Sequence, residues 1–423
     1  MHSASRHRQG GAVILTAALF LLFLLGFMGI AIDLGRLFVV KAELQTAVDS
    51  CALAAAQELD ASADAITRAR NAGRSAGNLN RVDLQSANWS GQGQLVDADI
   101  TFLDAALAPT ASGTAARYAR CQHTQPNLAL WLLPAMGAFG GDPAANPATR
   151  SVGASATATL LSAQSACPLP LALKPKTGGT APNYGFTVGE WATLLNAPGG
   201  GTAGQIGWAN LDGSNDARET EAELLGHCGT RVADRLGTPG VQATIVDVWN
   251  YRFGIYKNST SAAEHHPDYT GYSYTALNWP SRFDAWNGAT PAGAGATAAN
   301  YQVKKAAFAS CDDTGTRLRG ANSCESITGL SLNSFQKVAT PGPNATDGHA
   351  RYGGSRRTAI VPVVDGSMRV IDFACMFMLQ PLTLPMSNVQ LEFRGNTSAA
   401  GNPCQNSGLP GGTTGPLTPV LVQ

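Results

Sequence analysis

Residues 12–32 read AVILTAALFLLFLLGFMGIAI, and this stretch decides the fold. Thr16 is its only polar side chain. A helix rises about 1.5 Å per residue, so the stretch matches the roughly 30 Å hydrocarbon core of a bilayer. We therefore predict a transmembrane helix over 12–32, preceded by a short cytoplasmic tail over 1–11.

Charges on the two sides of this run bear on its orientation. Arg6 and Arg8 precede it, and Arg36 and Lys41 follow it. The positive-inside rule counts only Lys and Arg, so the charge bias is small and permits either orientation. We place the N-terminus inside because the rest of the chain reads as exported. A cleaved signal peptide is the alternative, but it needs a shorter apolar stretch and a small-residue site after it, which Ile32–Gly35 does not offer.

Composition limits the classes of function. The chain has 423 residues, zero formal net charge and only 14% charged residues, which argues against a nucleic-acid partner. Its 47 glycines and 23 prolines are typical of a loop-rich exported β or α/β protein. We predict no small-molecule substrate.

The eight cysteines are widely spaced and contain no CxxC pair, which disfavours a zinc ribbon or a thioredoxin-type site. In an oxidising compartment some of them should form disulfides. Cys311 and Cys324 are the nearest neighbours and the pair we favour. Cys51 has a second interpretation as a buried free thiol, since Cys behaves as a small hydrophobe.

The helical pattern continues beyond the apolar run. Over 33–60, apolar residues recur at spacings of three and four without an intervening proline, and they include Leu37, Val40, Leu44 and Ala47. This stripe packs either against the protein's own domain or against neighbouring subunits, and the sequence leaves both open. A second helix is predicted over 61–76, with Asp60 as its N-cap.

Three segments alternate apolar and polar residues and predict strands, namely Val96–Phe102, Ala115–Gln122 and Val152–Leu160. The apolar segment Asn127–Met136 between the last two is predicted to be helical. Residues 61–165 then form a small α+β domain, in which a long helix lies on a small antiparallel, pilin-like sheet.

From residue 166 the chain becomes rich in Gly, Pro and Asn, and we predict a second, loop-rich β domain over 166–395. Asp365-Gly366 between two apolar runs, Thr358–Val364 and Met368–Leu379, predicts a hairpin. A last strand begins at Val389. Residues 396–423 are predicted to be a flexible tail. The fold class is α+β: a long transmembrane and amphipathic helix, a small antiparallel sheet, and a mainly-β C-terminal domain.

The N-terminal residues resemble a known family. Arg8–Val13, the apolar run, Ile32–Leu37 (IDLGRL) and Leu44–Ala56 (LQTAVDSCALAAA) are similar to the TadG-like proteins of bacterial tight-adherence (Flp pilus) assembly systems. Members have a basic residue and Gly, a membrane helix, a D-x-G-R element and a Leu-Gln-x-Ala-x-Asp run. The resemblance implies an inner-membrane protein with an external domain that acts in pilus assembly or anchoring.

Two features depart from related patterns. Prepilin processing uses a Glu five residues after the Gly, and here Thr16 occupies that position, which argues against cleavage and polymerisation as a pilin. Many TadG proteins carry a von Willebrand A metal site that starts D-x-S-x-S. The nearest strings begin at Asp60, Asp212 and Asp365, and each lacks the second Ser. We predict no metal site.

Enzymatic patterns are also incomplete. Ser334–Lys337 has the form S-x-x-K and Lys176–Gly178 the form K-T-G, but their order is the reverse of that in penicillin-binding proteins. Glu264–His266 lacks a second cluster of ligands, and a solvated loop is the simpler interpretation. We predict no catalytic and no cofactor-binding residue.

These observations favour a membrane-anchored scaffold or minor component of a tight-adherence pilus assembly system. We expect it to contact pilus-assembly or pilin proteins through Leu37, Val40, Leu44 and Ala47. The external domain would lie in the periplasm or outside the cell. A surface adhesin whose C-terminal domain binds a glycan or protein is the alternative, and an envelope enzyme using Ser334 is a third reading.

Overall fold

A computed structural model describes residues 10–134, 147–196, 201–239, 243–312, 323–332, 334–399, 402–404 and 408–422. The chain divides into two compact units. Unit 1 comprises Met1–Leu160 with Pro419–Gln423, and unit 2 comprises Leu161–Thr418.

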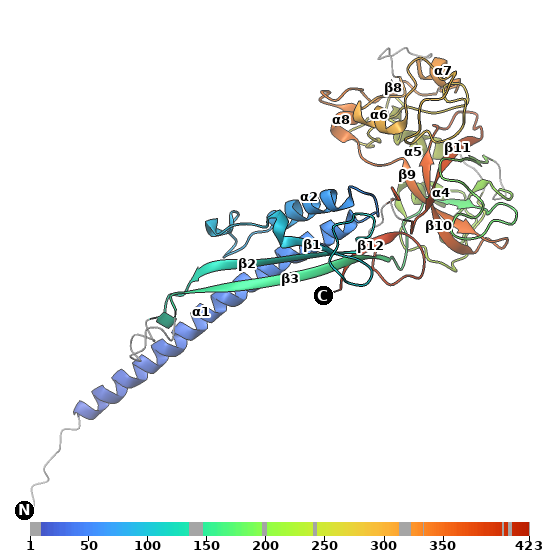
Figure 1. Ribbon diagram of the computed structural model, residues 1–423. Coiled ribbons are helices and arrows are strands. Elements are labelled where there is room, and N and C mark those ends of the chain that lie inside the picture. The colour runs from blue at the N-terminus through green and yellow to red at the C-terminus, as the bar shows by residue number, and fades with distance from the viewer. Residues whose placement is uncertain are drawn as a thin grey trace, which may run out of the picture. The chain divides into compact units, whose positions relative to one another are not determined.

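Unit 1 is organised around α1, a single helix from Gly10 to Gln57 (Figure 1). Ala and Leu are its commonest residues and it contains no proline, which favours an unbroken helix. The structure thus confirms one continuous helix through 12–32 and 33–57. By length and composition, α1 is long and apolar enough to cross a membrane.

The second helix, α2, begins at Ala65 and ends at Asn78. The prediction of a helix over 61–76 capped by Asp60 is wrong at its start. Ala61 takes a positive φ of 61°, and the Asp60 carboxylate accepts the backbone N–H of Ser62, so the chain turns before the helix can begin. Asp64 occupies the N-cap position instead. Two short 3-10 turns follow, η1 (Trp89–Gly91) and η2 (Asp97–Asp99).

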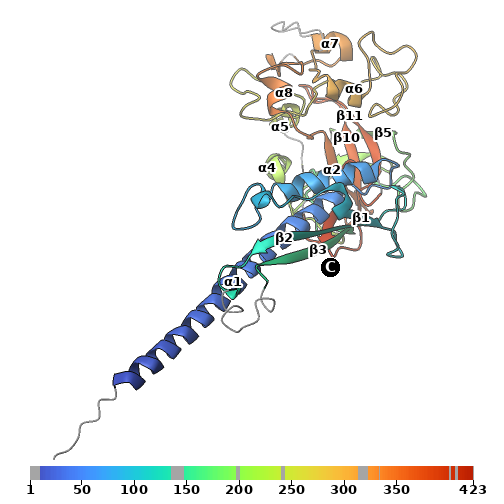
Figure 2. The ribbon, with the colours of Figure 1, turned by 60° about the vertical axis from the view of Figure 1, so that its left-hand side comes forward.

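The sheet of unit 1 has the strand order β1-β2-β3-β12, with bounds Ile100–Leu103, Tyr118–Ala129, Thr149–Ser162 and Leu417–Leu421. The β1–β2 and β2–β3 pairs are antiparallel. Both views show β2 and β3 running along the second half of α1, with α2 beside it (Figure 2).

Two sequence predictions in this region need correction. Val96–Asp99 is not a strand, because the Asp99 carboxylate accepts the N–H of Val96 and closes a turn. Asn127–Ala129 belongs to β2 rather than to a helix, since Leu128 and Ala129 pair with Arg150 and Thr149. The last two residues of the predicted helix, 135 and 136, lie outside the described residues. In β3, the predicted alternation holds at Val152–Ala156, where Ala154 and Ala156 are buried and Gly153 and Ser155 are exposed.

Unit 2 is built on a closed six-stranded barrel in the order β10-β11-β5-β6-β4-β9. The strands are β4 (Leu171–Leu173), β5 (Trp191–Leu194), β6 (Ile206–Trp208), β9 (Thr358–Val364), β10 (Val370–Met378) and β11 (Val389–Asn396). The antiparallel β9–β10 pair confirms the predicted hairpin.

Most barrel strands, namely β4, β6, β9 and β10, are buried on both faces. In β9, Val361 and Val363 point into the main core of unit 2, and Ile360 and Val364 contribute to a second cluster. Period-two alternation therefore separates two apolar clusters here, which makes the strand a continuous apolar run.

Short elements and loops surround the barrel. The helices are α4 (Glu219–Gly226), α5 (Ile245–Tyr251), α6 (Tyr301–Ala306), α7 (Ser323–Thr328) and α8 (Gly348–Tyr352). Strands β7 (Ile255–Tyr256) and β8 (Lys337–Val338) form a separate antiparallel pair.

All eight cysteines form disulfides: Cys51–Cys121, Cys167–Cys228, Cys311–Cys324 and Cys375–Cys404. The structure confirms the favoured Cys311–Cys324 pair. The alternative of Cys51 as a free thiol is wrong, because Cys51 on α1 faces Cys121 on β2.

The C-terminal region also differs from the flexible tail predicted over 396–423. Cys404 is bonded to Cys375 of β10, and Leu417–Leu421 forms β12. The Val422 N–H donates to the Thr157 carbonyl of β3, so the end of the chain completes the sheet of unit 1.

Candidate functional site

The first half of α1 displays apolar side chains all around its circumference. More than half of the surface of Ile14, Leu19 and Phe23 is exposed, and the same is true of Phe27. A helix that is apolar on every side is stable only when it is surrounded by other apolar groups. The Thr16 hydroxyl donates to the Val13 carbonyl one turn back, which satisfies a polar group that would be costly in hydrocarbon.

The second half of α1 is occupied by its own domain. Val40, Leu44 and Ala47 are fully buried in the core of unit 1, and Leu37 packs against that core. The prediction that the stripe contacts other pilus proteins is therefore wrong at Val40, Leu44 and Ala47, which have no surface left for a partner. Leu37 keeps part of its surface exposed.

Polar side chains beside the stripe also bind within unit 1. The Glu43 carboxylate accepts the N–H groups of Leu84 and Gln85. The Gln45 amide donates to the Ser155 carbonyl, and Lys41 donates to the Gly153 carbonyl. This face of α1 is thus committed to the protein's own loops and strands.

Asp33 lies directly after the apolar run and is fully buried. Its carboxylate accepts three successive backbone N–H groups, from Trp131 at 2.9 Å, Leu132 at 2.9 Å and Leu133 at 2.7 Å. Successive amides that converge on one anion form a nest, and bonds to a charged acceptor are strong. Asp33 therefore ties the segment that follows β2 to the helix.

Arg36 completes this clamp one turn later. Its Nη1 donates to the Ala129 carbonyl at 2.8 Å, and its Nη2 pairs with the buried Asp83 carboxylate at 3.1 Å. The guanidinium also lies 4.9 Å from the centre of the Trp131 ring. The Asp and the Arg of the D-x-G-R element thus hold the strand tip and the loop at Asp83, whereas a Cβ on Gly35 would meet open space.

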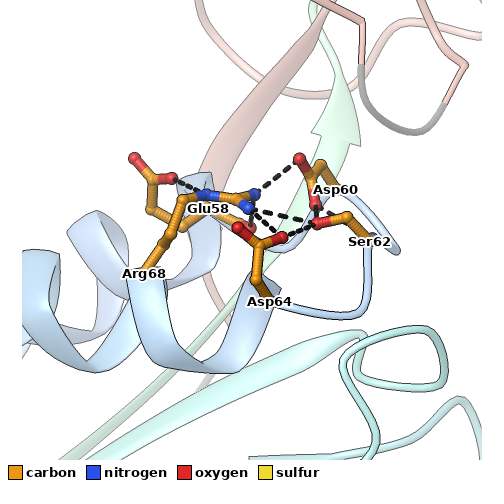
Figure 3. Close-up of polar contacts among 5 residues, drawn as sticks. All are labelled: Glu58, Asp60, Ser62, Asp64 and Arg68. Carbon is orange, nitrogen blue, oxygen red and sulfur yellow. Dashed lines mark hydrogen bonds and ion pairs between the residues drawn. The ribbon is translucent and has the colours of Figure 1, made fainter.

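A second polar cluster closes the corner between α1 and α2 (Figure 3). The Arg68 guanidinium lies between three carboxylates, those of Glu58, Asp60 and Asp64. The Ser62 hydroxyl lies 2.6 Å from Asp60 Oδ1 and 2.7 Å from Asp64 Oδ1 and donates to one of them. Hydrogen bonds from Arg68 and Ser62 lower the pKa of Asp64 to about 2.

This corner explains one of the D-x-S-x-S look-alikes. Asp60, Ser62 and Asp64 do converge, but the cation among them is Arg68. The other two strings form turns, in which Asp212 and Asp365 each accept the N–H of the Ser two residues later. Across the described part of the chain, no group of three or more His, Cys, Asp or Glu side chains is arranged to hold a metal ion.

Unit 2 has a buried charged centre that the sequence analysis missed. Asp268 accepts the N–H groups of Arg356 at 2.9 Å and Arg357 at 3.0 Å, and the Tyr301 hydroxyl at 2.9 Å. The buried Arg357 guanidinium donates to the carbonyls of Thr270, Tyr272 and Met378. These residues are far apart in sequence, so no local pattern identified them.

A pocket of about 510 Å³ opens on unit 2. Its lining includes Tyr251, Arg252, Arg356 and the Glu264–His266 segment. The His265 ring stacks on Tyr251 with centroids 4.0 Å apart, and Glu264 accepts the Ser261 hydroxyl at 2.8 Å. The Glu264–His266 segment therefore forms part of the pocket wall.

The two enzymatic patterns adopt other roles in unit 2. Ser334 precedes β8 rather than opening a helix, and Lys337 Nζ donates to the Asn258 carbonyl at 2.5 Å. Lys176 pairs with Glu190. Trp208, Trp249 and Trp279 are buried in the core, and Trp286 is partly buried against Tyr301 and Phe377.

The chain has an apolar N-terminal helix followed by two disulfide-bonded units. This arrangement places it in the class of proteins with a candidate N-terminal membrane anchor. Comparison with known families is more specific. Residues 10–58 match the model of the Tad family, described as "Putative Flp pilus-assembly TadE/G-like", which confirms the resemblance seen in the sequence. No curated protein and no solved structure matches the chain. The matched segment covers the whole of α1, including Asp33 and Arg36.

Proposed function

We propose that this protein is a membrane-anchored, non-enzymatic scaffold or minor component of a bacterial tight-adherence (Flp) pilus assembly system. The Tad match over residues 10–58 supports this system. The observation that carries the anchoring role is the contrast within α1, whose first half exposes apolar side chains and whose second half is buried in unit 1.

In this proposal the protein crosses the inner membrane once, with its N-terminus in the cytoplasm and both units outside. The four disulfides support that orientation, because disulfides form and persist in oxidising compartments. Alkaline phosphatase, which is active only outside the cytoplasm, can be fused after Gln423. An active fusion supports the orientation, and an inactive but intact one contradicts it.

A different face of α1 is available for partners. Leu34 and Phe38 are exposed, with 71% of the Phe38 surface accessible. On average they lie about 120° around the helix from the buried Val40 and Leu44, so they present a different face. An exposed apolar face that continues from a membrane segment suits a helix of another pilus protein. We propose that partners contact Leu34 and Phe38.

The experiment compares variants in a strain that lacks the chromosomal copy of this gene. The double variant Leu34→Gln, Phe38→Gln should fold and reach the membrane but lose surface pili and cross-links to pilus proteins. Leu277→Gln is the matched control, because Leu277 is also an exposed apolar residue but lies in unit 2. Normal piliation of the deletion strain would refute the system, whereas normal piliation of the double variant alone would refute the contact face.

The pocket in unit 2 favours one alternative, a surface adhesin. Tyr251, His265 and Arg252 present a ring stack and a cation that suit a glycan or a polar protein segment. If Tyr251→Ala abolished adherence while piliation stayed normal, the adhesin hypothesis would replace the scaffold hypothesis.

A further inference from the structure

The tip of the β2–β3 pair is held at a defined level of α1. Asp33 and Arg36 bind the backbone between Ala129 and Leu133. Leu132 contacts α1 about one turn before Asp33, at Gly29. A Cβ on Gly29 would lie only 2.9 Å from the Leu132 Cβ. The absence of a side chain at residue 29 therefore lets the tip rest directly on the helix.

This level coincides with the end of the apolar run. Gly29 lies three residues before Ile32, and at about 1.5 Å per residue that is roughly 5 Å on the membrane side. Asp33 and Arg36, the first charged residues after the run, mark its aqueous side. The tip therefore lies at the boundary between the apolar run of α1 and its first charged residues.

Two large side chains are exposed at this tip. Trp131 is 58% accessible and Leu132 39%. The neighbouring end of β3 adds the exposed Arg150, which pairs in register with Leu128. Trp is enriched at membrane interfaces, where its ring is partly in hydrocarbon and its N–H remains hydrated, and Arg suits the headgroup region.

We propose that Trp131 and Leu132 insert into the interfacial zone of the bilayer leaflet from which α1 emerges. The membrane then holds unit 1 at two points, the helix and the strand tip, which fixes the rotation and depth of α1. The inference rests on the proposed function in one respect, namely that α1 spans a membrane. Its occupant is the lipid surface, because the tip is continuous with the apolar run through Gly29 and Asp33.

The test uses the full chain reconstituted into phosphatidylcholine and phosphatidylglycerol vesicles, with and without lipids brominated at carbons 6 and 7, which quench nearby tryptophans. We expect bromolipid to quench the wild-type protein and the Trp131→Phe variant to lose most of that quenching. Equal fractional quenching in both proteins would overturn the proposal. Trp131 is exposed, so the variant should fold, and its circular dichroism should match that of the wild type.

Two further readouts separate the possible failures. Vesicle flotation reports the anchor: failure to float refutes the proposed membrane role, whereas flotation without Trp131-dependent quenching refutes only the tip insertion. A photoreactive benzoylphenylalanine at position 131 should then form adducts with lipid in cells. An adduct with another protein in place of lipid would show that a protein partner covers the tip and would overturn the proposal.

Discussion

In unit 1 the core is built along one helix, α1, on which α2 and β2 pack, whereas in unit 2 loops from distant parts of the sequence converge on buried charges. The core of unit 1 follows α1 through Val40, Leu44 and Cys51 and continues into the sheet. The centre of unit 2 joins Asp268, Tyr301 and Arg357 by bonds that span tens of residues. The first arrangement depends on apolar periodicity and the second on satisfied polar groups.

This difference predicts which substitutions each unit tolerates. Unit 1 should respond to loss of apolar volume on α1 and to loss of the bond between α1 and β2. Unit 2 should respond most to loss of a single polar side chain, because the partners that it leaves behind cannot reach water. Four experiments test this contrast, and all use the full chain in detergent.

Arg357→Met should have the largest effect. Its guanidinium is fully buried and bonds three backbone carbonyls, and the ring of Phe253 lies 4.3 Å away. Removal of one member of a buried charged network costs about 3–5 kcal/mol, and we expect a loss near the upper end in the free energy of unfolding of unit 2. Denaturant unfolding followed by tryptophan fluorescence would measure it.

The neighbouring Arg356→Met is the matched control for that experiment. The Arg356 side chain is exposed, and only its backbone N–H bonds Asp268. A change of less than about 0.5 kcal/mol is expected for an exposed side chain. If both variants lost the same stability, the buried centre would not be what holds unit 2 together.

Loss of a disulfide should destabilise unit 1 more than unit 2, the reverse of the effect expected for loss of a buried charge. The Cys51–Cys121 bond of unit 1 joins residues 70 apart, and the Cys311–Cys324 bond of unit 2 joins residues 13 apart. Loop-closure entropy assigns about 4 kcal/mol to the first and about 3 kcal/mol to the second. Paired Cys→Ala variants of each bond, followed by hydrogen exchange in each unit, would measure the difference. A larger loss from the shorter loop would contradict this account.

Leu44→Ala should destabilise unit 1 by about 3 kcal/mol, as expected for a leucine removed from a packed core. Phe38→Ala on the same helix should change stability by less than about 0.5 kcal/mol, because its side chain is exposed. Hydrogen exchange of the β2 amides compares the two variants. Equal protection in both would mean that the stripe is not buried in unit 1 and would reopen the predicted partner face.

The same contrast explains how much of the molecule could be predicted from the sequence. Periodicity along α1 is local, so the continuous helix and its apolar stripe were predictable. What covers the stripe was not, because the partners Cys121 and Ala156 lie on strands from later in the chain. The hairpin from Thr358 to Met378 was also predictable, since a turn and two apolar runs are adjacent in sequence.

The functional details were less accessible. The D-x-G-R element pointed to Asp33 and Arg36, yet their role depends on backbone groups about 95 residues later, at Ala129–Leu133. Backbone amides carry no sequence signal, so the clamp could not be predicted. Asp268 and Arg357 stood in no motif at all. Apolar segments next to tight turns were misread where a carboxylate, such as that of Asp60 or Asp99, redirected the backbone.

Acid should act on unit 2 through His349, with a smaller effect than the substitutions above. Burial, together with the nearby Arg357 cation, lowers the pKa of His349 to about 4, against the bond from Nδ1 to the Asp268 carbonyl at 2.7 Å. The unfolded chain takes up this proton near pH 6.5, so stability from His349 is present above pH 6.5 and is lost toward pH 4, on the order of 1 kcal/mol per pH unit. His349→Asn retains a donor near Nδ1 without a titrating ring, so this acid slope should shrink in the variant.

Glu392 has the opposite effect on stability in the wild type, because burial raises its pKa to about 7. Glu392 is present in both proteins, however, so its contribution cancels in their difference. In unit 1 the pKa of Asp64 is held near 2, so that carboxylate stays charged over this range. Hydrogen exchange of β10 should therefore show that acidification from pH 6.5 to pH 4.5 costs the wild type more protection than it costs His349→Asn. An equal change in both proteins would show that His349 does not make unit 2 acid-sensitive.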